Sequence, residues 1–151
     1  MNNQQLENLV KRLSPEAEVA EGKQFLEVTV KPGALKTLAL ALKENGESSL
    51  DFLFCMTGVD YGEELGVVYH LRSTSYQHEL VLKTRTANRD NPVIDTVGDI
   101  WKTALYHEDE IFDLLGIRFS GHPGLRRLFL EDDAGFPLRK DYVDEVNIVT
   151  K

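Results

Sequence analysis

Cysteine is almost absent from this sequence of 151 residues, which contains only Cys55. A single cysteine excludes an internal disulfide. It also excludes an all-cysteine zinc or iron–sulfur site made by this chain alone. Any redox metal near this chain would therefore belong to another protein.

Basic residues are in deficit as well. The chain has 17 lysines and arginines against 25 acidic residues, which gives a net charge of −8. Because phosphate binding needs a basic face, we expect no nucleic acid among the main partners.

Long apolar runs are missing too. No stretch approaches the roughly 20 consecutive apolar residues that a membrane-spanning helix requires. The polar segment Met1–Lys11 lacks the apolar core of a secretory signal. We therefore expect a cytosolic chain, or one that is seated peripherally on a larger assembly. The length and the 42% hydrophobic content suit one domain with a single core.

Hydrophobic spacing predicts a helix, two strands, a second helix, three strands and a last helix that ends at Gly116. Thr96 and Asp99 form a pair that resembles a capping box at the start of the last helix. This order predicts an α+β fold, a two-layer domain with helices packed on one face of a mixed sheet. The expected elements lie at residues 6–13, 16–20, 25–31, 32–42, 51–59, 66–72, 78–85 and 97–115.

The last third of the sequence behaves differently from the domain expected over residues 1–115. Residues 116–151, which we call the C-terminal arm, show no sustained periodicity and contain two proline turns. We do not expect the arm to bury its own large apolar side chains, so a partner surface would cover them. These side chains are Phe119, Leu125, Leu128, Phe129, Leu130 and Phe136.

Two acids on the last predicted helix need partners. Glu108 lies within its apolar stripe, and Asp113 opposes the helix dipole in the last turn. We expect the arm to fold back at the turn Gly121-His122-Pro123-Gly124 and to pair its arginines with these carboxylates. The alternative, that the charges are solvated surface, stays open. The basic residues of the arm are Arg118, Arg126, Arg127, Arg139 and Lys140.

Other chemistry-bearing residues form no complete set. His107-Glu108 matches half of a zinc-protease motif, but Ile111 stands where the second histidine is needed. His70 and His78 have no third ligand, and Cys55 is interpreted as a small buried hydrophobe. The acids Glu108, Asp109 and Glu110 resemble ordinary solvated or ion-paired groups. We expect no active site in this chain.

The stretch from Ile100 to Tyr142 resembles the C subunit of NADH:quinone oxidoreductase. It also resembles the related subunits of chloroplast-type NDH complexes, methanogen dehydrogenases and energy-converting hydrogenases. The chain departs from the family pattern in Asp109, where the family has arginine, and in Phe129, where a smaller apolar residue is usual. A Gly-His-Pro element and the run Pro137-Leu-Arg-Lys-Asp-Tyr142 also match. With identical spacing, the family signature falls on Glu108, Glu110, Asp113, Leu114, Leu115, His122 and Arg126.

The resemblance implies a non-catalytic structural or assembly subunit in the peripheral part of a complex-I-type oxidoreductase, with no cofactor or metal of its own. The parent reaction would be electron transfer from NADH, or from another donor, to quinone, coupled to ion translocation. The expected partners are the quinone-site subunit, which is hydrogenase-large-subunit-like, and iron–sulfur subunits. The chain would lie on the cytoplasmic side of the cell or inner membrane and would meet the membrane only through the complex.

The same resemblance implies a set of structural or partner-binding residues on the last helix and the arm. Two alternatives stay open: the equivalent subunit of a membrane-bound energy-converting nickel–iron hydrogenase, and a free-standing hydrolase or metal enzyme built on His107, Glu108 and His122. The implied residues are Glu108, Glu110, Asp113, His122, Pro123, Arg126, Arg127, Pro137, Leu138, Arg139, Lys140, Asp141 and Tyr142.

Overall fold

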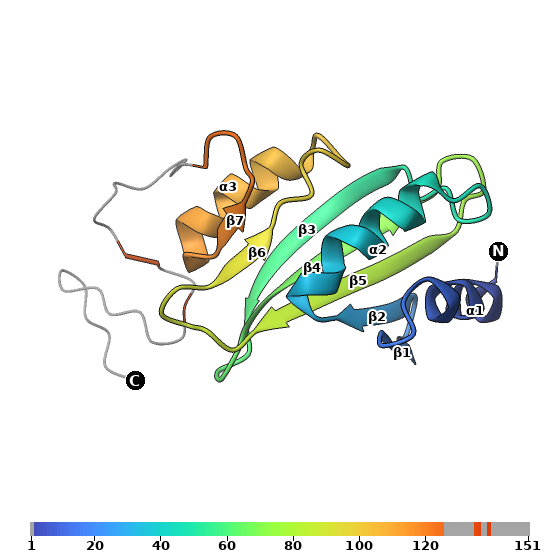
Figure 1. Cartoon of the computed structure of the whole chain (residues 1–151), viewed down its shortest axis with the longest axis horizontal. Coiled ribbons are helices and arrows are strands. Elements are labelled where there is room, and N and C mark those ends of the chain that lie inside the picture. The colour runs from blue at the N-terminus through green and yellow to red at the C-terminus, as the bar shows by residue number, and fades with distance from the viewer. Residues whose placement is uncertain (1, 126–134, 137–138, 140–151) are drawn as a thin grey trace.

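A curved sheet with helices on one face forms the body of the molecule (Figure 1). The computed structural model describes residues 2–125, 135, 136 and 139. The elements in chain order are α1 (Asn3–Leu13), β1 (Glu18–Glu21), β2 (Leu26–Val30), α2 (Pro32–Glu44), β3 (Phe52–Asp60), β4 (Leu65–Arg72), β5 (Glu79–Thr86), β6 (Val93–Asp95), α3 (Ala104–Leu115) and β7 (Arg118–Ser120).

The first two helices begin at the signals that the sequence contains. The Asn2 side chain accepts a hydrogen bond from the Gln5 backbone N–H at 2.8 Å, and the Gln5 side chain accepts one from Asn2 N–H at 2.9 Å. This reciprocal capping box satisfies two donors at the start of α1. Pro32 opens α2, where its missing N–H costs nothing.

The main sheet has five strands in the order β1-β2-β5-β4-β3. β2 pairs with β5 in parallel, and the other pairs are antiparallel. Val28, Leu82, Tyr69 and Met56 are aligned across four neighbouring strands and are all buried. The mixed sheet and the α+β class therefore confirm the prediction from the sequence.

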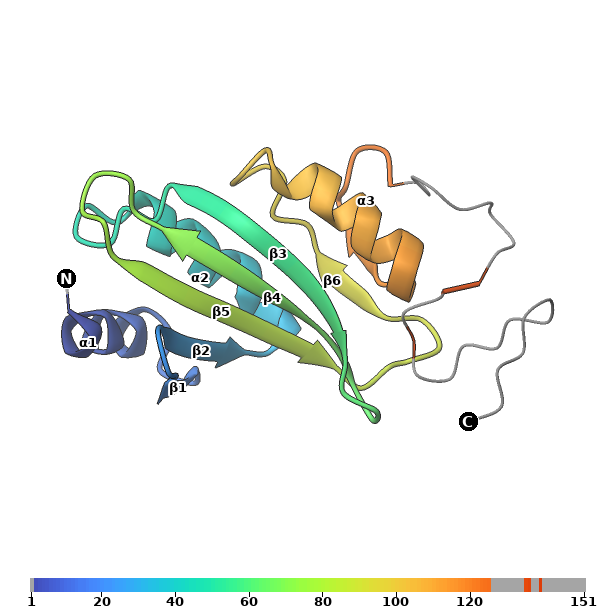
Figure 2. The same ribbon diagram turned by 180° about the vertical axis from the view of Figure 1, so that it is seen from behind.

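The helices α2 and α3 cover the same face of this sheet, which confirms the two-layer prediction. Gly58 pairs with Val67 in the core-facing register, and a Cβ atom at Gly58 would overlap Leu115 and would lie 2.9 Å from Ile111 Cγ2. The absence of a side chain at Gly58 thus allows α3 to approach β3 closely. Figure 2 shows the sheet from the opposite side, with α2 behind the strands.

The third helix begins later than the sequence indicated, at Ala104 instead of near Val97. The Thr96 N–H donates to Ser120 O at 2.9 Å and so continues the ladder of strands, and the Thr96 side-chain oxygen accepts from Gly98 N–H at the start of a turn. Asp99 is not a capping residue either, because it pairs with Lys36 at 3.0 Å. Turns between Val97 and Ala104 bury Ile100 and Trp101 at helix-like spacing.

A short two-stranded sheet was not predicted from the sequence. β6 and β7 pair in parallel, with Ile94 opposite Phe119. Phe119 is only 3% exposed and Ile117 is fully buried, so the expectation that Phe119 needs a partner surface is wrong. Packing of the domain continues past Leu115 as far as β7, whereas an extended arm beyond it stays a prediction. Within the described residues, no helix has the length and apolar character to cross a membrane.

We expect Gly58→Ala to lower the free energy of unfolding by about 1–3 kcal/mol, because the added methyl group overpacks the contact between β3 and α3. Gly33→Ala on α2 is the matched control. A Cβ atom there meets nothing within 4 Å, so that variant should be neutral or up to about 1 kcal/mol more stable. Urea unfolding of both chains measures the difference, and equal effects would contradict the packing.

Candidate functional site

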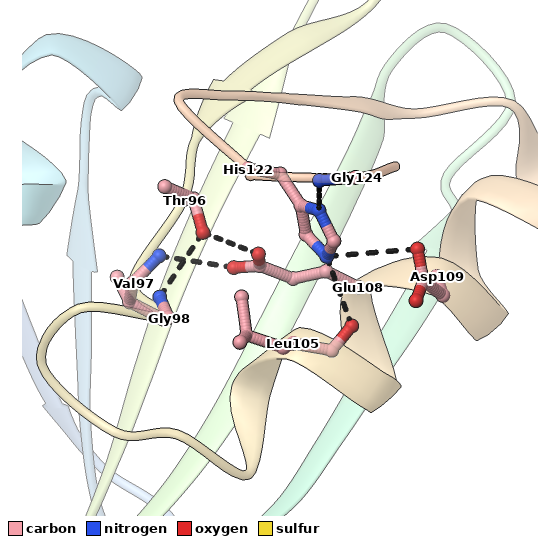
Figure 3. Close-up of polar contacts among 8 residues, drawn as sticks. All are labelled: Thr96, Val97, Gly98, Leu105, Glu108, Asp109, His122 and Gly124. Carbon is pink, nitrogen blue, oxygen red and sulfur yellow. Dashed lines mark hydrogen bonds and ion pairs between the residues drawn. The ribbon is translucent and has the colours of Figure 1, made fainter. Parts of the chain in front are cut away.

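Two of the signature residues, Glu108 and His122, lie together where β6, β7 and α3 meet (Figure 3). Parallel pairing of β6 with β7 brings Thr96, at the end of β6, next to the turn that follows β7. α3 lies across both segments and contributes Glu108 and Asp109. Residues that are far apart in the sequence thus form one polar cluster, which we call the Glu108 cluster: Thr96, Val97, Gly98, Leu105, Glu108, Asp109, His122 and Gly124.

The carboxylate of Glu108 is the centre of this cluster, and the residue is fully buried. One oxygen accepts a hydrogen bond from the Thr96 hydroxyl, and the other accepts one from Val97 N–H at 2.9 Å. The Thr96 oxygen in turn accepts from Gly98 N–H at 3.0 Å. Because both carboxylate oxygens are used, Glu108 holds the turn before α3 in place.

This arrangement corrects the expectation that Glu108 pairs with an arginine of the arm. Its hydrogen-bond donors in the described residues are uncharged groups from the chain segment just before α3. Buried carboxylates need donors, and a hydroxyl with a backbone amide provides them without a second buried charge. The interaction is therefore local to the domain.

Burial dominates the electrostatics of the cluster. It raises the pKa of Glu108 above the ordinary value, against the opposing effects of the Thr96 and Val97 hydrogen bonds and of His122. Tyr69, on the adjacent core face of β4, has a pKa well above its ordinary value. Burial is again the main cause, and the charges of Glu108 and Asp95 add to it.

His122 fixes the turn that leaves the domain. Its Nδ1 accepts a hydrogen bond from Gly124 N–H at 3.1 Å, so Nδ1 carries no proton. Its Nε2 lies 3.1 Å from Leu105 O, to which it donates. These two contacts select the neutral tautomer with its proton on Nε2. The side chain is 4% exposed, and both ring nitrogens are engaged.

Asp109, where the family pattern has arginine, also contacts this histidine. Its Oδ1 lies 3.5 Å from His122 Nε2. The substitution therefore places a carboxylate beside the turn, where it would form an ion pair with His122 only if the ring were protonated. No pattern in the sequence indicates this contact, because thirteen positions separate the two residues.

The C-terminal end of α3 meets two residues of the arm. Gly116 ends the helix in the left-handed region, at φ 78°. Arg139 Nε donates to Leu115 O at 2.6 Å, which places a cation at the negative end of the helix dipole. The Phe136 ring lies 6.2 Å from the Phe112 ring and 5.1 Å from the Arg139 guanidinium.

These contacts change the interpretation of the arm. Phe136 and Arg139 have partners within the chain, and Leu125 packs against the core. Leu125 and Phe136 are therefore partly covered by the chain itself, and covering of their remaining surface by a partner stays a prediction. Arg139 contacts a carbonyl and an aromatic ring, where the sequence led us to expect a carboxylate.

The remaining predicted residues are placed as follows. Asp113 is fully buried on α3, Glu110 is half-buried beside a hollow of about 90 Å³, and Pro123 is exposed. Several predicted residues, and three apolar side chains of the arm, lie outside the described residues. These are Arg126, Arg127, Leu128, Phe129, Leu130, Pro137, Leu138, Lys140, Asp141 and Tyr142.

The histidines outside the cluster have structural surroundings. His78 Nε2 lies 2.6 Å from Ser48 O, and burial lowers the pKa of this histidine. His70 lies between the rings of Phe25 and Phe54 on the other face of the sheet. Cys55 is half-buried on that face, so it is less buried than its interpretation as a small buried hydrophobe requires. In the part of the chain that is described, no three His, Cys, Asp or Glu side chains are grouped to hold a metal.

Together, the fold and the cluster define a class: a two-layer α+β domain with a short parallel ladder, whose buried carboxylate and histidine lock the turn that leads into the arm. The family described as respiratory-chain NADH dehydrogenase, 30 Kd subunit, matches residues 28–146. The chain belongs to this family.

Curated relatives agree with this assignment. The C/D subunit of the NADH-quinone oxidoreductase of Phocaeicola vulgatus is 53% identical over 108 residues, which cover 70% of this chain and 21% of that protein. The C subunit from Chloroherpeton thalassium is 42% identical over 117 residues, which cover 75% of this chain and 48% of that protein. The C subunit from Moorella thermoacetica is 38% identical over 136 residues, which cover 88% of this chain and 90% of that protein. The chain thus matches less than half of the first two proteins and most of the third.

The fold also occurs in an archaeal assembly. A chain in the structure of the membrane-bound sulfane sulfur reductase, an archaeal respiratory membrane complex, superposes with a TM-score of 0.75. The match covers 95% of this chain and 86% of that chain at 24% sequence identity. At this identity, the likeness establishes a shared fold.

We expect Glu108→Gln to remove part of the pH dependence of stability. Because burial raises the pKa of Glu108, the folded protein binds this proton more tightly than the unfolded chain does. The free energy of unfolding of the natural chain should therefore fall, relative to the variant, as pH rises from about 4, the ordinary glutamate pKa, through the raised pKa. Urea unfolding across this range measures the difference. A constant difference, or one that rises with pH, would contradict the assignment.

Proposed function

We propose that this chain is a structural subunit in the peripheral part of a complex-I-type NADH:quinone oxidoreductase, and that its C-terminal arm binds the quinone-site subunit. We infer the structural role from the hydrogen bonds that the polar atoms of the Glu108 cluster make within the chain. Both Glu108 oxygens and both His122 ring nitrogens have partners within the chain. A general base or a metal ligand needs an accessible lone pair directed at substrate or metal. Glu108 is fully buried with a hydrogen bond to each oxygen, and both ring nitrogens of His122 have partners, which favours a role in holding the fold.

The name of one relative supports the proposed partner subunit. The protein from Phocaeicola vulgatus carries the double designation C/D, and this chain matches only 21% of it. Two subunits joined in one polypeptide are held at high effective concentration, which favours contact between them. We infer that the partner of this chain is the equivalent of the D part of that protein, the quinone-site subunit.

Charge in the arm supports the same proposal. The whole chain has a net charge of −8, yet residues 116–142 carry five basic and four acidic side chains. Arg139 caps α3 within the chain, so the cations that we propose for partner binding are Arg126, Arg127 and Lys140. The planar guanidinium group of arginine can pair with a carboxylate through two parallel hydrogen bonds, and this defined geometry suits a permanent interface. The proposed apolar and polar contacts beside them are Pro123, Pro137, Leu138, Asp141 and Tyr142.

The Glu108 cluster would act by directing the arm. His122 ties Gly124 to Leu105, and Leu125 packs on the core, so the chain leaves the domain at a fixed place. A fixed exit lowers the conformational entropy that docking must remove. We therefore assign Glu108 and His122 to positioning and the residues that follow to contact.

The parent assembly would transfer electrons from NADH to quinone, with iron–sulfur groups held by other subunits, and would place this chain at the cytoplasmic side of the membrane. The equivalent subunit of an energy-converting hydrogenase is the second candidate. The same fold occurs in an archaeal respiratory membrane complex that is named as a sulfane sulfur reductase, so the fold by itself does not require NADH as the electron donor. NADH-dependent or hydrogen-dependent activity of the purified assembly distinguishes the two.

We expect His122→Ala to reduce the recovery of assembled complex several-fold when the tagged chain is purified from native membranes. Loss of the two ring contacts frees the exit of the arm, while turnover per assembled complex stays unchanged. His107→Ala is the matched control, because this half-buried histidine lies on α3, is not part of the Glu108 cluster, and has its ring contact with Tyr106. Urea unfolding of the isolated variants separates loss of docking from loss of folding.

Three results would contradict the proposal. The tagged natural chain could be recovered without iron–sulfur-bearing partners, which removes the assembly role. His122→Ala could assemble normally with lost turnover, which indicates catalysis. The isolated chain could turn over a substrate or bind a stoichiometric metal, which would favour a free-standing enzyme.

A further inference from the structure

The face of the sheet opposite α2, which we call the open face, carries a row of aromatic rings. Phe52 and Phe54 on β3 lie 6.2 Å apart, Phe54 lies 5.7 Å from His70 on β4, and His70 lies 6.2 Å from Phe25 in the β1–β2 connection. The phenylalanines on β3 are 44% and 40% exposed. Figure 2 views this side of the sheet, with β3, β4 and β5 in front of α2.

A β-bulge interrupts β3 beside these rings and puts the neighbouring residues Phe54 and Cys55 on the open face. Leu53 pairs with Leu71 on the core side, and the register then shifts, so that Cys55 pairs with His70 on the open face. Phe54 is the extra residue of the bulge and contacts His70. Bulges re-aim side chains at sheet edges, and β3 is the edge strand. A regular strand would not put Phe54 and Cys55 on one side.

Next to the rings, the open face has a hollow of about 640 Å³. Its apolar lining comes from three strands and from the loops beside them, and includes Phe25, Val59, Tyr61, Val68 and Val81. A sheet face that is meant for water normally alternates with polar side chains. Grouped apolar side chains with exposed rings are typical of an interaction surface.

The rim of this hollow is basic, although the chain is acidic. Lys23 and Lys83 line the hollow with one acid, Glu27, which pairs with Lys83 at 2.5 Å. Arg85 stacks 3.9 Å above the Tyr61 ring. The residues that line the hollow include two cations and one acid, and Arg85 lies against a lining ring, in contrast with the net charge of −8 for the chain. Electrostatic complementarity therefore selects an acidic partner surface.

We propose that the open face binds a second subunit of the same assembly, through an apolar segment flanked by acidic residues. The apolar side chains of the segment would cover Phe52, Phe54 and the hollow, and its acids would meet Lys23 and Arg85. This contact lies on the opposite side of the sheet from α2 and α3, so it is separate from docking of the C-terminal arm. It rests on the proposed function, because it requires that the chain belong to an assembly.

The test compares Phe54→Ser with Leu40→Ser in tagged chains purified from native membranes. Leu40 lies on α2 and is 42% exposed, so the two changes remove similar apolar exposure from different faces. We expect Phe54→Ser to lower recovery of the assembled complex at least fivefold and Leu40→Ser to leave it unchanged. Phe54→Tyr, which keeps the ring, should restore recovery. Both serine variants should unfold in urea at the midpoint of the natural chain.

A photo-crosslinking residue at position 52 identifies the occupant in the intact assembly. The expected crosslink is to a peptide of another subunit that contains apolar residues next to Asp or Glu. A crosslink to a second copy of this chain, to its own residues, or to a basic peptide would overturn the inference, as would normal assembly of Phe54→Ser. Failure of the natural chain to copurify with any subunit would overturn the proposed function as well, so the two failures are distinguishable.

Discussion

A buried carboxylate that accepts its hydrogen bonds from a hydroxyl and a backbone N–H is the constraint on which this structure depends. Removing the charge of Glu108 from water costs several kcal/mol unless donors meet it. The donors are the Thr96 hydroxyl and Val97 N–H, and both must be held at the end of β6 to reach the carboxylate. The pairing of β6 with β7 provides that support. One buried group thus connects the short ladder, the turns before α3 and the helix itself.

The same constraint explains why the signature residues of the family act on structure. His122 lies beside Glu108 and ties the turn after β7 to the carbonyl of Leu105. With the polar atoms satisfied internally, the cluster sets where the chain leaves the domain. Under the proposed function, the chemistry of the parent assembly belongs to its other subunits. The arm and the open face are the two surfaces that we propose this chain offers to them.

Much of the fold was predictable because its signals are local. Alternation in β2 and helical spacing in α1 and α2 identify those elements, and the Glu108 position in an apolar stripe identified a buried acid. The partners of that acid were not predictable. Thr96 has the residue type and the position of a helix cap, and turns between Val97 and Ala104 repeat helical spacing. Strands of three residues, such as β6 and β7, are too short to show a period. The contact between Asp109 and His122 follows only from the tertiary fold.

Turnover per assembled complex in a Glu108→Gln variant tests the central claim most directly. The side chain stays nearly the same in size, while the buried charge is removed. If the cluster is structural, the amount of assembled complex changes and each assembled complex reduces quinone at the natural rate. A fully assembled complex that has lost quinone reduction would contradict the account, because Glu108 would then take part in the reaction.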